Sequence, residues 1–392
     1  MSDHTKQTRI SFLQQRLAAL EIDAAMLILA RDVFYYTGTA QPCILIVTPN
    51  DYCLLVRRAL DFVVHETWLD SDKIIEKGSF EDACGRLKEL GVHKGRLGLE
   101  LDIVPAQLFF KIMHTFASFE AVDLGMEITL QRMEKDQEEI DLTIAACRIR
   151  NAGHQRVLAT LCEGMSELEL AAEVEYAHRL AGHEGVLIVR NFDFNMGGGP
   201  LASGDNLFNI SGFANTITGV GLSAAVPAGP SLRKIKPGDA VVIDIPTCYH
   251  GYHCDETRTY VLGKASVAQT DLYKALLEIS DQVVATLRAG VKSSAVFDAA
   301  YACACKLGVE QYFLGLGPRK ANFVGHGIGL DYNEPPVLFA KSDFEIRNNS
   351  TLTVEMHLTH PEHGAVKLED VVLVKDNGCE ILSVTEREMF VV

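Results

Sequence analysis

Hydrophobic and polar positions in the first third of the chain follow helical and strand periods in turn. A polar amphipathic segment, Ser11 to Leu20, leads to the apolar run AAMLILA, and the runs CILIVTP and DYCLLV follow, separated by a PND turn. The run GRLGLE comes later. Alternation of helix-like and strand-like segments is typical of a layered α/β unit. We therefore expect residues 1–130 to form a small α/β domain.

The rest of the chain, residues 131–392, has long helical patterns followed by strands. Residues 133–161 place apolar side chains at helical spacing behind an acidic first turn, and Ser166 and Glu169 form a capping box for a second helix with a stop at Gly182. Helices are also expected at about 270–289 and 294–307, whereas the Gly-rich segment 191–229 predicts loops and short strands near a surface or cleft. The runs LTVEMHLTH and AVKLEDVVLV predict strands, so this is a second domain of mixed helices and strands.

Composition excludes several classes of protein. The chain has 392 residues, of which 48% are hydrophobic, and can bury a core of two-domain size. Its formal charge of −16 provides no basic stripe for nucleic acid or an anionic membrane. The N-terminal sequence has no signal-peptide core and no apolar run is long enough to span a bilayer, so we expect a cytoplasmic protein. Ten cysteines without a CxxC pair do not indicate a zinc knuckle or a disulfide framework.

The segment IDIPTCYHGYHCDETRTYVLG, residues 243–263, carries two aspartates inside an apolar hairpin pattern. We expect His250-Gly251 to form a two-residue turn. The register that follows pairs Tyr249 with Tyr252, Cys248 with His253, Pro246 with Asp255, and Asp244 with Thr257. Strand alternation then puts both aspartates on one face as diagonal neighbours, roughly 7–8 Å apart at the backbone. Two carboxylates this close repel each other when buried, which indicates a metal site unless the face is simply solvated.

Three further residues strengthen the metal interpretation. His326 lies between Gly325 and Gly327, where missing side chains would let the backbone approach a ligand, although a histidine in such a loop often has no special role. Glu355 and Glu369 interrupt apolar strands, and each would be ordinary on an exposed edge. Four carboxylates and an imidazole together suit a pair of Mn, Co, Fe or Zn ions, which activate a water molecule and polarise a carbonyl for hydrolysis.

The contexts of these five residues resemble those of the pita-bread metallopeptidases, which include prolidase, aminopeptidase P, methionine aminopeptidase and creatinase. The motifs occur in order: VVIDIP, GYHCDETRTYVLG, GHGIGLD, LTVEMH and KLEDVVLV. The resemblance covers nearly the whole chain, with residues 1–130 similar to the N-terminal domain of the prolidase and creatinase branch. It implies an α+β pita-bread catalytic domain over 131–392, homodimers, and a dinuclear site. The implied metal ligands are Asp244, Asp255, His326, Glu355 and Glu369, with Glu355 also the general base.

The chain departs from this family pattern on the substrate side. Proline-directed members usually carry histidines where this chain has Ala228, Asn322 and Asn333, and those histidines bind the peptide and stabilise the tetrahedral intermediate. Lys367 replaces the usual Arg before the last ligand, and Met356-His357 replaces Pro-Gly. We therefore assign Asn322, Asn333 and Lys367 to the substrate pocket and leave the proline preference open.

Two other histidines are candidates for the missing catalytic groups. His253 lies two residues from Asp255, and His357 lies two residues from Glu355, so strand alternation turns both imidazoles toward the metal-bearing face. We expect one or both to act in catalysis; the alternative is that His253 only packs in the sheet and His357 caps an exposed edge.

The sequence thus predicts a metal-dependent hydrolase of the Xaa-Pro peptidase type that uses two divalent ions and acts on a small peptide or peptide-like amide. One alternative is an enzyme of the same fold that acts on a non-peptide substrate, as a creatinase-like hydrolase or a lyase. A second alternative is a catalytically silent binding protein.

Overall fold

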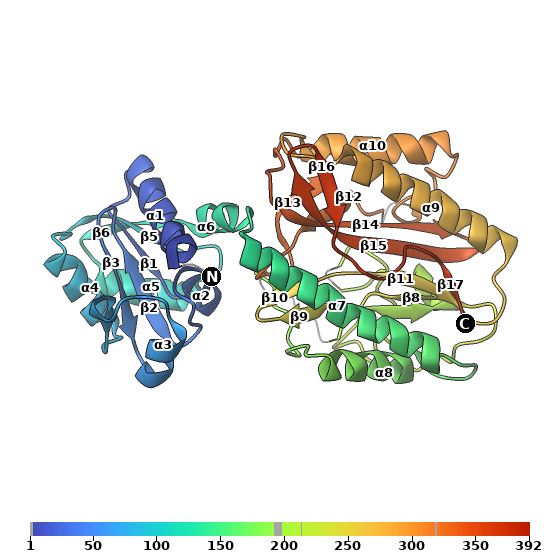
Figure 1. Ribbon diagram of the computed structural model, residues 1–392, viewed down its shortest axis with the longest axis horizontal. Coiled ribbons are helices and arrows are strands. Elements are labelled where there is room, and N and C mark those ends of the chain that lie inside the picture. The colour runs from blue at the N-terminus through green and yellow to red at the C-terminus, as the bar shows by residue number, and fades with distance from the viewer. Residues whose placement is uncertain (1–2, 192–197, 213, 318–319) are drawn as a thin grey trace. The chain divides into compact units, whose positions relative to one another are not determined.

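The computed structural model describes residues 3–191, 198–212, 214–317 and 320–392 (Figure 1). Backbone contacts divide the chain into two compact units, Met1–Arg132 and Met133–Val392. Each unit has its own sheets and its own apolar core.

The N-terminal unit is built around a six-stranded mixed sheet with strand order β4-β3-β2-β1-β5-β6. Its elements are α1 (Asp3–Ala19), β1 (Ala24–Leu27), α2 (Ala30–Thr37), β2 (Cys43–Val47), β3 (Tyr52–Val56), α3 (Leu60–Glu66), β4 (Ile74–Ile75), α4 (Phe80–Glu89), β5 (Gly95–Leu99), α5 (Ala106–Thr115), β6 (Phe119–Asp123) and α6 (Gly125–Arg132). Helices α4 and α5 bury their apolar side chains against one face of the sheet. Helices α1 and α2 pack against β2. The expected small α/β domain is confirmed.

A buried charged cluster lies inside the N-terminal unit. Arg132 Nη1 is 2.8 Å from Asp32 Oδ1, and both side chains are buried. Glu100 accepts hydrogen bonds from the backbone N–H groups of Ile28 and Leu29. Burial and then the neighbouring Asp32 carboxyl raise the pKa of Glu100 well above its ordinary value.

The described part of the C-terminal unit contains four long helices. The first has the expected acidic first turn, and the second has the expected capping serine. The four helices are α7 (Gln137–Thr160), α8 (Glu167–Leu180), α9 (Val267–Thr286) and α10 (Ser293–Lys306). At the start of α8, Ser166 accepts from the Glu169 N–H while the Glu169 side chain accepts from the Ser166 N–H, so the capping box is confirmed. Gly182 follows the end of α8 with a φ of 111°, which a side-chain-bearing residue rarely adopts.

The strands of the C-terminal unit form three sheets with orders β10-β9, β17-β11-β8-β7 and β13-β12-β14-β15-β16. Their bounds are β7 (Leu201–Ser203), β8 (Ala240–Ile243), β9 (Thr247–Tyr249), β10 (Tyr252–Cys254), β11 (Arg258–Val261), β12 (Phe323–Gly327), β13 (Glu334–Phe339), β14 (Thr351–His360), β15 (Gly364–Lys375), β16 (Gly378–Ile381) and β17 (Phe390–Val391). The expected strands LTVEMHLTH and AVKLEDVVLV are β14 and most of β15.

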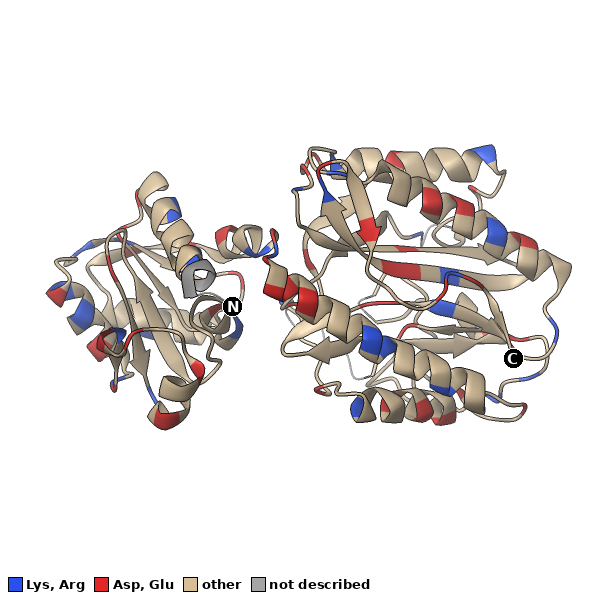
Figure 2. Ribbon diagram, viewed as in Figure 1, with Lys and Arg blue, Asp and Glu red and all other residues tan. Residues whose placement is uncertain are grey.

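Helices cover the outer faces of these sheets, and the strands between them face inward (Figure 1). Helices α9 and α10 pack on one face of the five-stranded sheet through the largest apolar cluster of this unit. Helices α7 and α8 pack against the strands of the smaller sheets. Figure 2 shows charged residues on the inner strands as well as on the helices. The arrangement of helix pairs outside paired sheets is the expected α+β pita-bread fold.

The hairpin register predicted from the sequence is confirmed where strands pair. Tyr252 pairs with Tyr249 and His253 with Cys248. His250 and Gly251 have φ values of 48° and 81°, as a two-residue type I′ turn requires. On the far side of the two aspartates, Arg258 of β11 pairs with Ile243 of β8, which continues the same register. The segments between these pairs belong to no strand, and there the Asp244 N–H donates instead to Pro200 O.

No helix among the described residues is long and apolar enough to cross a membrane.

Candidate metal centre

The five residues with predicted metal-binding roles come from both halves of the C-terminal unit. Asp244 directly follows β8 and Asp255 directly follows β10, whereas His326 lies in β12, Glu355 in β14 and Glu369 in β15. All five are buried, with exposures between 0% and 7%. The alternative of edge-exposed glutamates is therefore wrong, because β14 and β15 are inner strands of the five-stranded sheet.

Glu355 and Glu369 face each other directly across the β14–β15 pair. On β14, Val354, Met356 and Leu358 point into the apolar core under α9 and α10, so alternation sends Glu355 to the opposite, inner face. Like charges directly opposite one another destabilise a sheet. Their position on the inner face requires cations to balance them.

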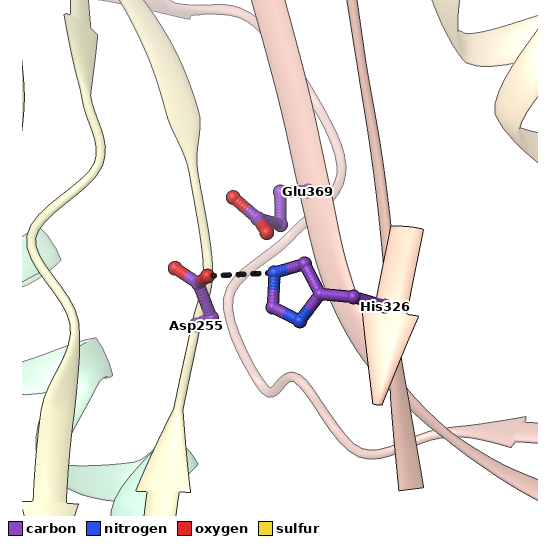
Figure 3. Close-up of side chains that lie close together, drawn as sticks. All are labelled: Asp255, His326 and Glu369. Atoms are coloured by element: carbon purple, nitrogen blue, oxygen red, sulfur yellow. Dashed lines mark ion pairs between the residues drawn. The ribbon is translucent and has the colours of Figure 1, made fainter. Parts of the chain in front are cut away.

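Asp255, His326 and Glu369 converge most tightly. Ligand atoms of these three side chains all lie within 4.8 Å of one another, and Figure 3 shows the three side chains pointing toward a common space. His326 Nδ1 is 2.9 Å from Gly327 O, so this nitrogen carries the proton and donates it. In the neutral ring Nε2 carries the lone pair, and this atom lies 3.8 Å from Asp255 Oδ2 and 3.5 Å from Glu355 Oε1. A neutral imidazole in this tautomer is a metal ligand.

The glycines around His326 are required by neighbouring strands. A Cβ on Gly325 would collide with Thr353 O of β14, and the φ of 151° at Gly325 also disfavours a side chain. A Cβ on Gly327 would collide with the carbonyls of Glu334 and Pro335 of β13. The sequence predicted that these glycines let the backbone approach a ligand. In the structure they allow three strands to pack closely, and this packing fixes the position of His326.

Carboxylate oxygens without a protein partner surround this space. Asp244 Oδ1, Asp255 Oδ1 and Glu369 Oε1 are buried and accept no hydrogen bond. Burial, and then the neighbouring carboxylates, raise the pKa of Asp255 well above its ordinary value and that of Glu369 to about 8. Buried acceptors left unpaired are costly unless a ligand satisfies them. The donor set of oxygens and one imidazole fits a divalent cation such as Mn²⁺ or Zn²⁺.

Lys367 provides a positive charge inside the same cluster. Its Nζ is 2.6 Å from Asp244 Oδ2, 3.0 Å from Glu355 Oε2 and 3.2 Å from Glu369 Oε2. Burial would lower the pKa of Lys367, but the surrounding carboxylates outweigh burial and raise it well above its ordinary value. The lysine is therefore an ammonium ion in direct contact with three of the five predicted ligands.

A cavity of about 500 Å³ opens onto this cluster. It is lined by Asn191, Pro200, Ala214, Asn215, Thr216, Asp244, Asn322, Phe323, His326, Tyr332, Asn333, Val337, Glu355 and Lys367. The three residues assigned to the substrate pocket from the sequence, Asn322, Asn333 and Lys367, all line it. Ala228 does not.

Both candidate catalytic histidines are held away from this cavity. His253 Nδ1 is 2.9 Å from Gly329 O, and its Nε2 accepts from the Ile188 N–H at 3.1 Å. Two backbone partners leave that ring no free nitrogen for a substrate. His357 is buried, and burial and then the Lys367 charge lower its pKa to about 3. Neither lines the cavity. The contacts of His253 favour a structural role, whereas His357 Nε2 is buried without a hydrogen-bond partner, and both catalytic roles stay untested predictions.

The structure adds polar residues that the sequence did not single out. Thr257 Oγ1 donates to Glu369 Oε2 at 2.7 Å, and burial and then the neighbouring Asp255 carboxylate raise the pKa of Tyr332 well above its ordinary value. Thr216 Oγ1 is buried without a partner in the cavity wall, as is Oδ1 of Asn333, which the sequence had already assigned to the pocket. Strand alternation gives a signal only for Thr257, which shares a face with Asp255; the others lie on loops.

The fold and the cluster define a metal-dependent hydrolase, because buried carboxylates and an imidazole with unpaired ligand atoms face a cavity of substrate size. The family model for metallopeptidase family M24 matches residues 141–376, and the Creatinase/Prolidase N-terminal domain matches residues 9–134. The chain belongs to metallopeptidase family M24, and it is a peptidase-type hydrolase. Membership in this family implies divalent metal ions.

Individual relatives agree with the family assignment. An Xaa-Pro dipeptidase of Pyrococcus horikoshii is 26% identical over 372 residues, which cover 94% of both chains. Among solved structures, an Xaa-Pro dipeptidase from Bacillus anthracis matches with a TM-score of 0.82 and 22% identity, covering 99% of this chain and 100% of that one. An X-Pro aminopeptidase from Thermotoga maritima matches with a TM-score of 0.79 and 24% identity, covering 98% and 99%. These two structures support the fold.

Proposed function

We propose that this protein hydrolyses an amide bond of a small peptide, with a preference for a proline-containing substrate like that named for its relatives. The observation that carries the proposal is the convergence of Asp255, His326 and Glu369, with unpaired oxygens on the two carboxylates and with His326 in the cavity wall. The Xaa-Pro dipeptidase of Pyrococcus horikoshii supports the substrate class.

The proposed metal ligands are Asp244, Asp255, His326, Glu355 and Glu369. A bound divalent ion lowers the pKa of a water molecule and polarises the carbonyl of the substrate. The sequence predicts two such ions, bridged by the shared carboxylates. How many bind at once depends on Lys367, because its ammonium contacts three of these ligands.

Glu355 is the proposed proton carrier. It lines the cavity, whereas Glu369 and Asp255 do not, so a substrate and a water molecule can reach its carboxylate. Its Oε1 lies beside His326 Nε2 and its Oε2 accepts from Lys367, which fixes the orientation of the carboxylate. In this role Glu355 takes a proton from the attacking water and gives it to the leaving nitrogen.

The cavity wall suits a neutral amide. Asn191, Asn215, Asn322 and Asn333 offer both donors and acceptors, and Phe323 and Val337 provide apolar surface. His326 is the sole histidine among the described lining residues. Because family histidines bind the peptide in proline-directed members, their replacement by asparagine also favours a second candidate, hydrolysis of a non-peptide amide of similar size.

A substrate panel tests the proposal. The chain is stripped of metal, reloaded with Mn²⁺, Co²⁺ or Zn²⁺, and assayed on Xaa-Pro dipeptides, longer peptides with proline at the second position, and dipeptides without proline. Glu355→Gln keeps the size of the side chain and should lower kcat by about 10²-fold or more. Glu380→Gln, on an exposed position of β16 in the same sheet, is the matched control and should keep full activity.

Cleavage by the metal-loaded chain that is lost in Glu355→Gln supports the proposal. Full activity of Glu355→Gln would remove this residue from the reaction. If the metal-loaded chain cleaves none of the peptides, the non-peptide amide becomes the proposed substrate. The homodimer, the cytoplasmic location and the choice of manganese remain predictions from the sequence.

A further inference from the structure

We propose that the Lys367 ammonium acts as a built-in cation that takes the place of a second metal ion, so that the protein binds one divalent ion tightly. This inference rests on the proposed function, because it concerns the metal site of that hydrolase. It differs from the prediction of two ions, which followed from the number of ligands and from the family resemblance.

The contacts of Lys367 are those of a bound cation. An ammonium group has three N–H donors and no acceptor, and here Nζ lies within 3.2 Å of one oxygen from each of three carboxylates, on Asp244, Glu355 and Glu369. The side chain is 1% exposed. A compact ammonium is closer to a metal ion in size and charge distribution than the planar guanidinium of the usual arginine.

The carboxylate oxygens divide into two groups around two positions. One group, Asp244 Oδ2, Glu355 Oε2 and Glu369 Oε2, surrounds Lys367 Nζ. The other group is formed by Asp255, His326 Nε2 and Glu369, with Glu355 Oε1 3.5 Å from the imidazole nitrogen. Asp244 is absent from the set of three residues whose ligand atoms gather within 4.8 Å. The lysine therefore occupies the Asp244 side of the cluster, and the imidazole side is left for a metal ion.

The backbone holds Lys367 in this position from both sides. The Lys367 N–H donates to Thr259 Oγ1 at 3.0 Å, and that hydroxyl donates back to Lys367 O at 2.7 Å. On the other side Lys367 pairs with His357 of β14. A divalent ion at the Asp244 position would share its ligands with this ammonium, and the two positive charges would repel each other at close range. Binding of a second ion there is therefore disfavoured.

Metal binding to the full chain tests the inference. Protein stripped with a chelator is titrated with Mn²⁺ or Zn²⁺ by calorimetry, and the bound metal is counted by elemental analysis. We expect about one ion per chain for the wild type and about two for Lys367→Met, which removes the charge and keeps the stem of the side chain. The matched control is Lys135→Met, a buried lysine paired with Glu334 outside the cluster, which should stay at about one.

A measurement on the wild type alone covers the case in which Lys367→Met fails to fold. The electron paramagnetic resonance spectrum of the Mn²⁺-loaded chain should be that of an isolated ion, and a spin-coupled pair would overturn the inference. Tight binding of about two ions by the wild type would also overturn it, as would an unchanged stoichiometry in folded Lys367→Met. Failure to bind any ion would instead refute the proposed function, so the two failures are distinguishable.

Discussion

Arg258 offers a quantitative test of how the metal-bearing strands are held. Its guanidinium is fully buried and donates five hydrogen bonds: to the carbonyls of Thr257, Glu369, Thr385 and Glu386 and to Asp370 Oδ1, at 2.7 to 3.0 Å. Two of these carbonyls belong to Thr257 and Glu369, which form an isolated β-bridge. This β-bridge joins the end of the hairpin to β15.

The perturbation is Arg258→Lys, which keeps the charge but loses the planar fork. A lysine can retain one contact with Asp370, so about four hydrogen bonds are lost. At about 1 kcal/mol each, the free energy of unfolding of this unit should fall by about 4 kcal/mol, similar to the cost of breaking a buried ion pair. Arg156→Lys, in a half-exposed pair with Glu173, is the matched control and should change it by less than about 0.5 kcal/mol.

The assay is urea unfolding of the full chain, followed by two signals. Far-ultraviolet circular dichroism reports helices in both units, whereas Trp68, the single tryptophan, lies in the N-terminal unit. The urea concentration at the midpoint of the circular-dichroism transition should be lower by roughly 1 M in Arg258→Lys than in the wild type. A loss below about 1 kcal/mol, similar to that of Arg156→Lys, would refute the argument that these hydrogen bonds hold the strands.

Three further predictions follow from other contacts. Gly325→Ala should weaken Mn²⁺ binding by at least about tenfold in calorimetry, because the new Cβ collides with Thr353 O and displaces His326. His253→Ala should lower the unfolding free energy by about 2 kcal/mol yet keep kcat, since both ring nitrogens bind backbone groups. The N-terminal unit should lose stability as pH rises from about 4.5 through the folded pKa of Glu100, by at most about 1.4 kcal/mol per pH unit, measured through Trp68 emission.

The sign of the last prediction follows from the raised pKa. Folded Glu100 keeps a proton that the unfolded chain releases, so its contribution is full below the unfolded pKa and is lost as pH rises through the folded pKa. Glu100→Gln should remove this slope, and an equal slope in that variant would contradict the assignment. Unchanged metal affinity in Gly325→Ala, or a kcat of His253→Ala reduced about 10²-fold, would contradict the other two.

The local fold of the site could be predicted because short-range chemistry determines it. The His250-Gly251 turn sets the hairpin register, and alternation along the strands places Glu355 and Lys367 on inner faces. Sequence alone could not give the order of the five strands, which buries both glutamates. That order depends on packing between segments far apart along the chain.

Contacts with loops also lay beyond sequence reasoning. Alternation predicts that His253 shares a strand face with Asp255, but the groups that bind its ring nitrogens are Ile188 N–H and Gly329 O, on loops with no periodic signal. Lys367 and Glu369 are two residues apart in one strand and therefore share a face, but no sequence pattern indicates the 2.6 Å contact between Lys367 and Asp244, which follows a strand of another sheet. The features of the site that sequence patterns do not indicate are therefore tertiary contacts.

The most direct test of the central claim is hydrolysis of an Xaa-Pro dipeptide measured against the amount of bound metal. The full chain is stripped of metal, Mn²⁺ is added back in steps, and bound metal and rate are recorded for wild type and for His326→Ala. The account predicts a wild-type rate that rises in proportion to bound metal, and loss of both metal and rate in His326→Ala. A wild-type rate that is insensitive to the chelator, or that stays at zero with metal bound, would contradict it.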